Sequence, residues 1–319
     1  MSRRRARESH HDWMKRHLGF LLSLKNEYLQ KDIASPQDAE YGFWSIKKLI
    51  AVNYLIPTFC KLALTGNFTR CYYLDLLAGS GILRFGDILP GSAMVALAAD
   101  TPAQGFEKYF FIESDKQKAT LLEKRLQQIG RSLANRRFEV RAEDCNRALP
   151  TILGEIYSGD PSRSCFLALF DPEGYAETAW STLETLLGHG KGDLIFNFTE
   201  GVARNVEKAR TDKSYRPLLE RYFGEPESEW LHLKGYDELI EHYKTKLASV
   251  NGITRTVFRI DVRDQKKRPL YGLLFATGSS GFANVIEYLK SRLDMTEARH
   301  LQNIYDQLMK KIKPLSNYQ

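Results

Sequence analysis

The chain has 319 residues, and 43% of them are apolar, which is enough for one large domain or for a domain with a sizeable insertion. No apolar run approaches the length of a membrane span, and residues 1–7 lack the apolar segment of a secretory signal. We therefore expect a cytoplasmic globular protein that does not enter a membrane. The formal net charge of +7 permits a polyanionic partner such as nucleic acid but does not require one.

The four cysteines, Cys60, Cys71, Cys145 and Cys165, are scattered along the chain. No two of them form a Cys-x-x-Cys pair, and no histidine stands at the spacing of a zinc ligand. This pattern indicates neither a zinc site nor a disulfide framework, so we expect reduced thiols and no metal.

Two helices are expected before the first strand, because apolar residues recur at helical spacing from His10 to Leu29 and from Tyr41 to Leu64. We interpret residues 1–66 as an N-terminal helical region packed on the core, close to the edge of the sheet where ligands bind. Lys47 and Lys48 lie in the second helix, where lysines usually face solvent. Lys47 is the candidate for a contact with phosphate or substrate.

Residues 71–81 join the pattern of a buried strand to a turn of small residues. The near-continuous apolar run is typical of a parallel strand covered on both faces, and Asp75, which interrupts it, needs a polar reason to be there. The turn that follows lacks large side chains, so its backbone can bend sharply and approach a ligand closely. The candidates for contact with a nucleoside cofactor are Asp75, Ala78, Gly79, Ser80 and Gly81.

Acidic residues follow the next two expected strands. Glu113 closes the strand that begins at Lys108, where an acid can hydrogen-bond the ribose hydroxyls of a nucleoside held over the first turn. Asp144 follows a third strand, at Arg137 to Ala142, and its carboxylate could accept the exocyclic amino proton of adenine beside the backbone of Cys145. An ordinary turn at the end of a strand is the alternative for Asp144.

Between the first and second strands, Ile82 to Leu89 is expected to be a loop that helps cover a cofactor. The segment from Ala93 to Ala99 is expected to be a helix, with Ser92 as its N-cap.

The fourth strand, which includes the apolar run from Phe166 to Phe170, leads directly into Asp171 and Pro172. Pro172 lacks an N–H and stiffens the turn, so the Asp171 carboxylate and nearby carbonyls stay directed into the site as acceptors. An amino group that attacks a methyl group needs such acceptors to aim its lone pair, and an aromatic face for its ring. The catalytic candidates are Asp171, Pro172 and Tyr175, with Gly174 as a candidate substrate contact. The alternative is a turn that ends a strand and carries a surface tyrosine.

The rest of the chain completes an α/β pattern. A fifth strand from Gly192 ends near Asn197 and Phe198, which are candidates for substrate contact. The helical patterns of residues 204–250 are divided by prolines and predict a helical insertion within a domain of residues 67–319. The last two strands are expected at Thr254–Val262 and Pro269–Thr277, as a hairpin followed by two helices.

Seven strands that end in an antiparallel hairpin resemble the class I S-adenosylmethionine-dependent methyltransferase fold, with a Rossmann-like, mostly parallel sheet. The motifs resemble those of this superfamily in the same order. The resemblance implies that Asp75 and 78–81 lie at the methionine end of S-adenosylmethionine, Glu113 at its ribose, Asp144 and Cys145 at its adenine, and 171–175 at the methyl acceptor.

More narrowly, an ordered set of segments resembles the three-Cys-motif partner family, TcmP. These segments are 74–81, 90–92, 110–113, 144–146, 170–174, 193–198 and 204–205. In that family the three cysteines belong to a separate protein that looks like a radical-SAM enzyme, which agrees with the lack of a cysteine motif here. The resemblance implies such a protein as a partner and brings no settled substrate.

The leading hypothesis is methyl transfer from S-adenosylmethionine to a base nitrogen of RNA or DNA. The alternative is a non-catalytic module that binds the cofactor and docks on the radical-SAM-like protein. A nicotinamide-dependent oxidoreductase would share Gly-x-Gly and the ribose acid but would not explain Asp144 or the Asp-Pro turn. The turn resembles the Asp-Pro-Pro-Tyr of adenine-N6 methyltransferases, but Glu173 and Gly174 separate Pro172 from Tyr175, so stacking of Tyr175 on a base stays open.

Overall fold

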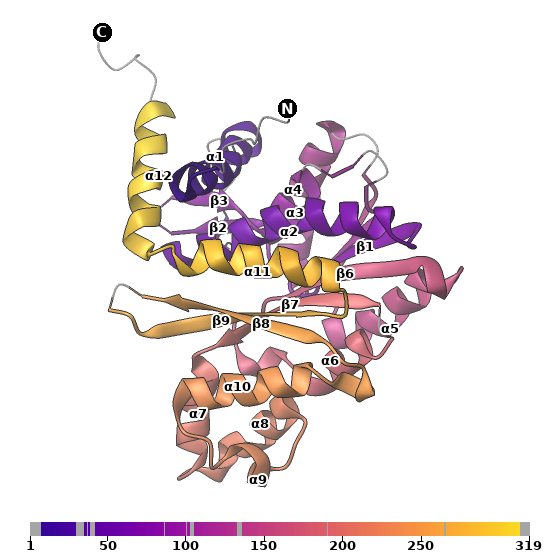
Figure 1. The fold of residues 1–319 in the computed structure, drawn as a ribbon, viewed down its shortest axis with the longest axis vertical. Helices are drawn as coiled ribbons and strands as arrows, with labels where there is room; N and C mark the ends of the chain where they lie inside the picture. The colour runs from indigo at the N-terminus through magenta and orange to yellow at the C-terminus, as the bar shows by residue number, and fades with distance from the viewer. Residues whose placement is uncertain are drawn as a thin grey trace, which may run out of the picture.

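The fold is built on a seven-stranded, mostly parallel sheet with helices on both faces (Figure 1). The computed structural model describes residues 8–29, 35–36, 38, 42–85, 87–99, 101–102, 105–132, 136–189, 191–264 and 266–312. The strand order is β5-β4-β1-β6-β7-β9-β8, and β9 runs antiparallel to both of its neighbours. The predicted Rossmann-like sheet with an antiparallel C-terminal hairpin is therefore confirmed.

The strands of this sheet match the predicted segments closely. They are β1 (Arg70–Asp75), β4 (Lys108–Ile112), β5 (Phe138–Arg141), β6 (Ser164–Phe170), β7 (Gly192–Thr199), β8 (Thr256–Arg263) and β9 (Pro269–Thr277). The first five pair in parallel, so their carboxyl ends lie along one edge of the sheet.

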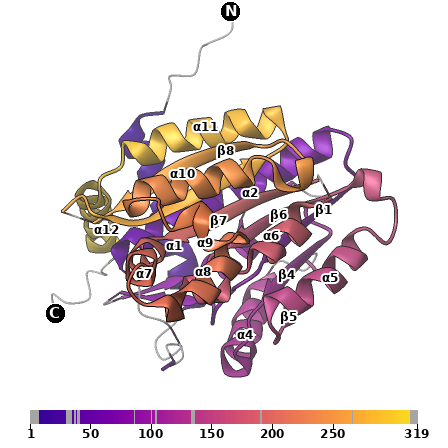
Figure 2. The same ribbon diagram turned by 90° about the horizontal axis from the view of Figure 1, so that it is seen from below.

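Helices form a layer on each face (Figures 1 and 2). One layer contains α2 (Ile46–Thr65), α3 (Ser92–Ala98), α4 (Lys116–Ser132) and α11 (Ser280–Asp294), and α1 (His10–Tyr28) and α12 (Ala298–Ile312) pack against this layer and each other. The other layer contains α5 (Cys145–Ile156), α6 (Trp180–Leu187), α7 (Gly201–Ala209), α8 (Arg216–Phe223), α9 (Glu227–Trp230) and α10 (Gly235–Leu247).

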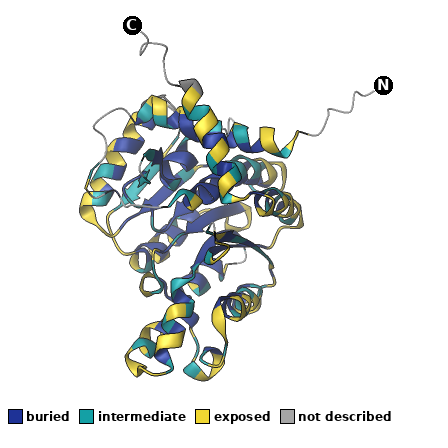
Figure 3. Cartoon of the chain, turned by 90° about the vertical axis from the view of Figure 1, so that its left-hand side faces the viewer, coloured by how far each residue is buried: buried dark blue, intermediate teal, exposed yellow. Residues whose placement is uncertain are grey.

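Alternation along β1 shows why the sheet is covered on both sides. Cys71 and Tyr73 point into the layer that contains α2, whereas Tyr72 and Leu74 point into the layer that contains α5. A strand that is buried on both faces must be apolar at nearly every position, which explains the continuous runs in the sequence. The inner strands β1, β4, β6, β7 and β9 are largely buried, the edge strands β5 and β8 are only partly buried, and the outer faces of the helices are exposed (Figure 3).

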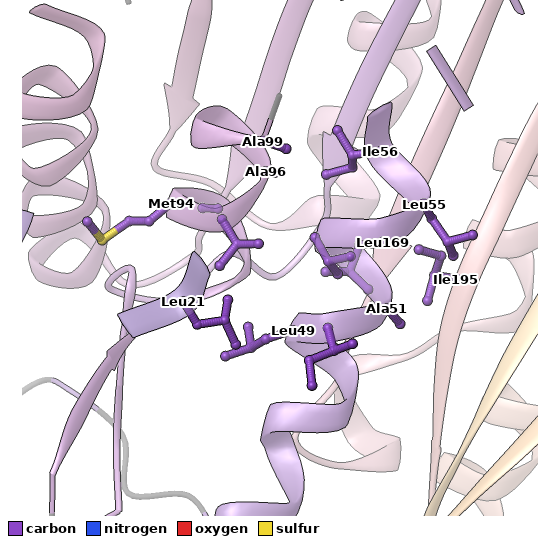
Figure 4. Close-up of a cluster of buried hydrophobic side chains, with 14 of the residues drawn as sticks. Leu21, Leu49, Ala51, Leu55, Ile56, Met94, Ala96, Ala99, Leu169 and Ile195 are labelled. Carbon is purple, nitrogen blue, oxygen red and sulfur yellow. The ribbon is translucent and has the colours of Figure 1, made fainter. Parts of the chain in front are cut away.

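Helix α2 is the central helix of its layer. The helical stretch Phe43–Thr65 is long and apolar enough, by length and composition alone, to cross a membrane, but 56% of its most apolar window is buried in the fold. Leu49 packs with Leu21 of α1, and α2 also lies against Leu169 of β6 and Ile195 of β7 (Figure 4). Packing on the sheet accounts for the apolar composition of this helix.

Two local predictions differ from the structure. The predicted loop at residues 82–89 contains most of a short antiparallel hairpin, β2 (Ile82–Arg84) and β3 (Ile88–Pro90), whose strands are too short to give a periodic signal. Ser92 is not the N-cap of α3, because Gly91 occupies that position and Ser92 is the first helical residue. The Ser92 hydroxyl is thereby turned toward β1, where it donates to Asp75.

The predicted helical insertion is confirmed as helical, from α7 to α10. Its last helix, α10, packs on β8 and β9, as a helix that connects two strands of a sheet usually does. The remaining helices, α7 to α9, extend the layer below the sheet (Figure 1). The domain boundary between residues 66 and 67 stays a prediction. The four cysteines are free and buried.

Candidate active site

A cleft of about 150 Å³ lies at the carboxyl ends of β1, β4 and β6. Strand order reverses beside β1, and in open α/β sheets this is where ligands bind. Among its lining residues are Lys48, Gly79, Ser80, Gly81, Glu113 and Asp171. The cleft is smaller than the roughly 300–1,000 Å³ of most pockets that enclose a ligand of drug size. A nucleoside would therefore extend past the cleft, toward the exposed lining residues Asp115, Glu173 and Glu177.

The turn after β1 has a backbone that requires glycine. Gly79 and Gly81 have φ values of 63° and 88°, which side chains with a Cβ rarely adopt. A Cβ on Gly91 would lie 2.9 Å from the carbonyl carbon of Gly81, and the Gly91 N–H donates to the Gly81 carbonyl at 2.7 Å. A Cβ on Gly79 would meet no atom within 4 Å, so the backbone at Gly79 borders open space. These properties fit a ligand that approaches the main chain.

Asp75 is fully buried behind this turn. One carboxylate oxygen accepts a hydrogen bond from Ser92 at 2.7 Å, and the other has no hydrogen-bond partner among the described residues. Burial raises the pKa of Asp75 to about 7, although the Ser92 hydrogen bond opposes the shift. A buried acceptor without a donor is uncommon, and it is suited to a ligand that brings an N–H or an ammonium group.

Glu113 lies at the end of β4, as predicted for a ribose-binding acid, and lines the cleft. Its side chain accepts a hydrogen bond from the Asp115 N–H at 2.8 Å, which fixes the carboxylate in place. Glu113 is only 8% exposed, so its carboxylate lies against the wall of the cleft and does not extend into bulk solvent.

Asp171 lies across the cleft and forms a buried ion pair with Lys48 of α2. The side chains of Lys48 and Asp171 are 6% and 13% exposed. The other Asp171 oxygen accepts from the Asn197 amide at 2.8 Å, while the Asn197 side-chain oxygen has no hydrogen-bond partner among the described residues. Asn197, predicted as a substrate contact, thus holds the candidate catalytic carboxylate in place.

Lys47 does not lie in this cleft. Its ammonium donates to the carbonyl of Leu293 at 3.2 Å, at the end of α11, and burial lowers its pKa. Consecutive residues of a helix point about 100° apart, so only one of the two lysines can face the cleft. Lys48 is the lysine that reaches Asp171, and the contact of Lys47 with phosphate or substrate stays a prediction.

Asp144 and Cys145 are not brought into the cleft. The Asp144 carboxylate caps α5 by accepting from the Asn146 N–H at 2.9 Å, and Cys145 is buried in the layer of α5. The contact of both residues with adenine stays a prediction.

The predicted aromatic contacts are also placed elsewhere. Phe198 has no exposed surface and packs against Tyr222 and Tyr243, so the expected contact of its ring with a base does not fit this structure. Tyr175 is half-buried against the layer of α8, next to a turn that Arg221 of α8 holds through the carbonyl of Ala176. Pro172, the residue that follows Asp171, is buried.

A buried network that the sequence did not reveal fastens the glycine turn. The Arg125 guanidinium of α4 donates to both oxygens of Asp38, at 2.6 and 3.0 Å, and to the Ser80 carbonyl at 2.7 Å. The Ser80 hydroxyl also donates to Asp38, at 2.5 Å. Burial opposes ionisation of Asp38, but the hydrogen bonds from Arg125 and Ser80 outweigh it and hold its pKa below the ordinary value. Asp38 and Arg125 lie 87 residues apart, so no sequence motif joins them.

Comparisons with known proteins give only distant similarities. No family model matches the chain, and no curated protein matches it. A solved structure from Legionella pneumophila is 13% identical, with 79% of this chain and 93% of that chain covered and a TM-score of 0.46. The O-methyltransferase TomG of Streptomyces achromogenes, solved with SAM, is 13% identical (82% and 90% covered, TM-score 0.41). TYW2 of M. jannaschii, solved with AdoMet, is 11% identical (74% and 76% covered, TM-score 0.36). At these TM-scores the similarities do not bear on what the chain does.

Proposed function

We propose that the chain transfers a methyl group from S-adenosylmethionine to a nitrogen of a nucleic-acid base. One observation supports this above all: the glycine turn, Glu113 and Asp171 come from distant parts of the sequence and line one cleft at the switch point of the sheet. Bound S-adenosylmethionine supplies a methyl group that is already activated by a sulfonium, so the protein needs mainly to position the reactants.

The residues on the cofactor side fit a nucleoside with an amino acid tail. Gly79 and Gly81 let the ligand approach the backbone, and Glu113 would hold ribose hydroxyls. The oxygen of Asp75 that lacks a donor would serve the ammonium of the methionine part, either directly or through a water. The ordinary alternative, a strand end with a solvated glutamate, leaves this buried oxygen unexplained.

On the acceptor side, Asp171 would accept a proton from the attacking nitrogen and aim its lone pair. Asn197 fixes one oxygen of the carboxylate, which limits rotation of the side chain. Pro172 follows without an N–H, so the turn cannot donate to the carboxylate from that position. Tyr175 remains a candidate for contact with the substrate outside the cleft.

Nucleic acid is proposed as the substrate because of the charge of the chain and the resemblance of its Asp-Pro turn to that of base-modifying enzymes. The formal net charge is +7 and the pI is about 9.1. Clustered lysines and arginines release counterions when they meet phosphate, which favours binding of a polyanion.

A second candidate function is a non-catalytic module that binds the cofactor and docks on a radical-SAM-like three-Cys-motif protein. The observation that favours it is the Lys48 ammonium, which lies where an acceptor nitrogen would be held by Asp171. A module that binds no external substrate would not need to move Lys48 away from Asp171.

Transfer of labelled methyl groups into total tRNA, rRNA and DNA separates the two functions. We expect label in one of these fractions with the wild-type chain and with Glu123→Gln, a control on the exposed face of α4. Asp171→Asn should abolish the label while calorimetry still detects S-adenosylmethionine binding. Binding without label in any fraction would contradict base methylation and favour the docking module.

A further inference from the structure

The nitrogen held by the candidate catalytic carboxylate belongs to the protein itself. Lys48 of α2 lines the cleft, and its ammonium donates to Asp171 Oδ2. The glycine turn and Glu113 line the same cleft. Among the residues that the structure describes, Lys48 is the only one that forms an ion pair with Asp171.

Both oxygens of Asp171 are already engaged. Asn197 donates to Oδ1 at 2.8 Å and Lys48 donates to Oδ2. Each carboxylate oxygen can accept more than one hydrogen bond, so an amine from an external substrate would have to share Asp171 with these two donors. Taking Asp171 away from Lys48 altogether would leave a buried ammonium without its counter-ion, which is unfavourable for an ion that stays out of water.

Lys48 is also held in place by its helix. The neighbouring residues Leu49, Ile50 and Ala51 are fully buried, and α2 packs against α3, α11 and β1. The Lys48 side chain is 6% exposed, so its stem and ammonium are surrounded by the protein. A lysine that merely covers a surface would extend its ammonium into water.

We infer that Lys48 Nζ is itself a methyl acceptor and that the chain methylates this lysine within the same molecule. The inference rests on the proposed binding of S-adenosylmethionine in the cleft. The Nζ proton passes to Asp171 Oδ2 along the existing hydrogen bond, and the nitrogen lone pair then forms a bond to the methyl carbon. The carbon–sulfur bond breaks with its electron pair left on sulfur. The products are methyl-lysine, a protonated Asp171 and S-adenosylhomocysteine, and the total charge is unchanged.

The adjacent lysine provides a matched internal control. Lys47 is buried to a similar extent but donates to the carbonyl of Leu293 instead of to Asp171. Non-enzymatic methylation by the sulfonium would not prefer Lys48 over exposed lysines such as Lys61. A modification confined to Lys48 therefore reports the geometry of the cleft.

Mass spectrometry after incubation with S-adenosylmethionine tests the inference directly. A protease that cuts before aspartate leaves Lys47, Lys48 and Lys61 in one peptide, from Asp38 to Leu74, and fragmentation assigns the modified residue. We expect one added methyl group on Lys48 in the wild type and in Lys47→Arg. We expect none in Lys48→Arg, which keeps the cation, or in Asp171→Asn, which removes the base.

The rate gives a second criterion. Because Lys48 is buried, one molecule cannot present it to the cleft of another. The fraction methylated at a given time should therefore stay constant when the protein concentration is changed tenfold. A rate that rises in proportion to protein concentration would contradict transfer within one molecule.

Binding affinity provides a readout that does not depend on turnover. If Lys48 Nζ lies beside the methyl-bearing sulfonium, its positive charge opposes S-adenosylmethionine but not the neutral S-adenosylhomocysteine. Lys48→Met should then raise the affinity ratio of the first ligand to the second by about fivefold or more, the effect of two unit charges some 4 Å apart even in high dielectric. Lys47→Met, the control, should leave the ratio unchanged.

The results distinguish this inference from the proposed function. If the chain binds S-adenosylmethionine and labels nucleic acid while Lys48 keeps its unmodified mass and the affinity ratio does not change, self-methylation is overturned and the proposed function stands. If the chain does not bind S-adenosylmethionine at all, both are overturned. Methyl groups spread over several exposed lysines would also overturn the inference.

Discussion

Removing Arg125 should cost more stability than removing any exposed arginine, because it strands a buried carboxylate. The Arg125 side chain is 4% exposed and that of Asp38 is 0% exposed. In Arg125→Met the aliphatic stem is replaced but Asp38 loses both guanidinium bonds and the Ser80 carbonyl loses its donor. Breaking a buried pair by removing one partner typically costs about 3–5 kcal/mol. We expect a loss in this range.

Urea unfolding at neutral pH, followed by circular dichroism, measures this loss. The matched control is Arg137→Met, since Arg137 pairs with Glu107 at 3.4 Å with side chains that are 77% and 46% exposed. Exposed pairs contribute about 0–1 kcal/mol. The double variant Arg125→Met with Asp38→Leu should be more stable than Arg125→Met alone, because no charge is left buried and unpaired.

The pH dependence gives the sign of the effect independently. The folded-state pKa of Asp38 is lowered, so its contribution is present above its unfolded pKa, near 4, and is lost as the pH falls through the folded value. The difference between wild type and Arg125→Met should therefore shrink in acid. A loss below about 1 kcal/mol at neutral pH, equal to that of Arg137→Met, would refute the reasoning.

Two further predictions concern the cleft itself. Gly91→Ala should destabilise the chain by about 1–3 kcal/mol, because the new Cβ would lie 2.9 Å from the Gly81 backbone. The control is Gly154→Ala, on the exposed face of α5, where a Cβ meets nothing within 4 Å and the change should be neutral or stabilising. Thermal unfolding compares the two variants, and equal melting temperatures would contradict this prediction. Asp75→Asn should be more stable than the wild type above pH 7, by up to about 4 kcal/mol, and equally stable below pH 4. The reason is that Asp75 has a folded-state pKa of about 7, so the stability of the wild type falls as the pH rises from about 4 to 7. Urea unfolding from pH 4 to pH 8 checks this, and a difference that does not change with pH would be inconsistent with a buried, titrating Asp75.

The sheet could be predicted because its inner parallel strands are buried, and therefore apolar, on both faces. The runs in β1, β4 and β6 are long enough to stand out from helical patterns, and the acids Glu113 and Asp171 mark their ends. The hairpin β2–β3 left no such signal, because strands of three residues show no period.

The side chains that complete the site were harder to predict. The choice between Lys47 and Lys48 depends on the rotation of α2 about its axis, and the packing of its apolar residues against two helices and the sheet sets that rotation. A sequence with apolar residues on most sides of the helix does not fix it. Asp38 and Arg125 are far apart in the sequence and come together only in the folded chain. The Asp144 carboxylate, which was predicted to contact adenine, instead accepts a hydrogen bond at the start of α5.

The central claim is that the cleft binds S-adenosylmethionine through Glu113, and titration calorimetry tests it most directly. We predict measurable binding to the wild-type chain and to Glu123→Ala, and a loss of at least about tenfold in affinity for Glu113→Ala, as expected when hydrogen bonds between a carboxylate and ribose are removed. Absence of binding to the wild type, or an unchanged affinity for Glu113→Ala, would contradict it.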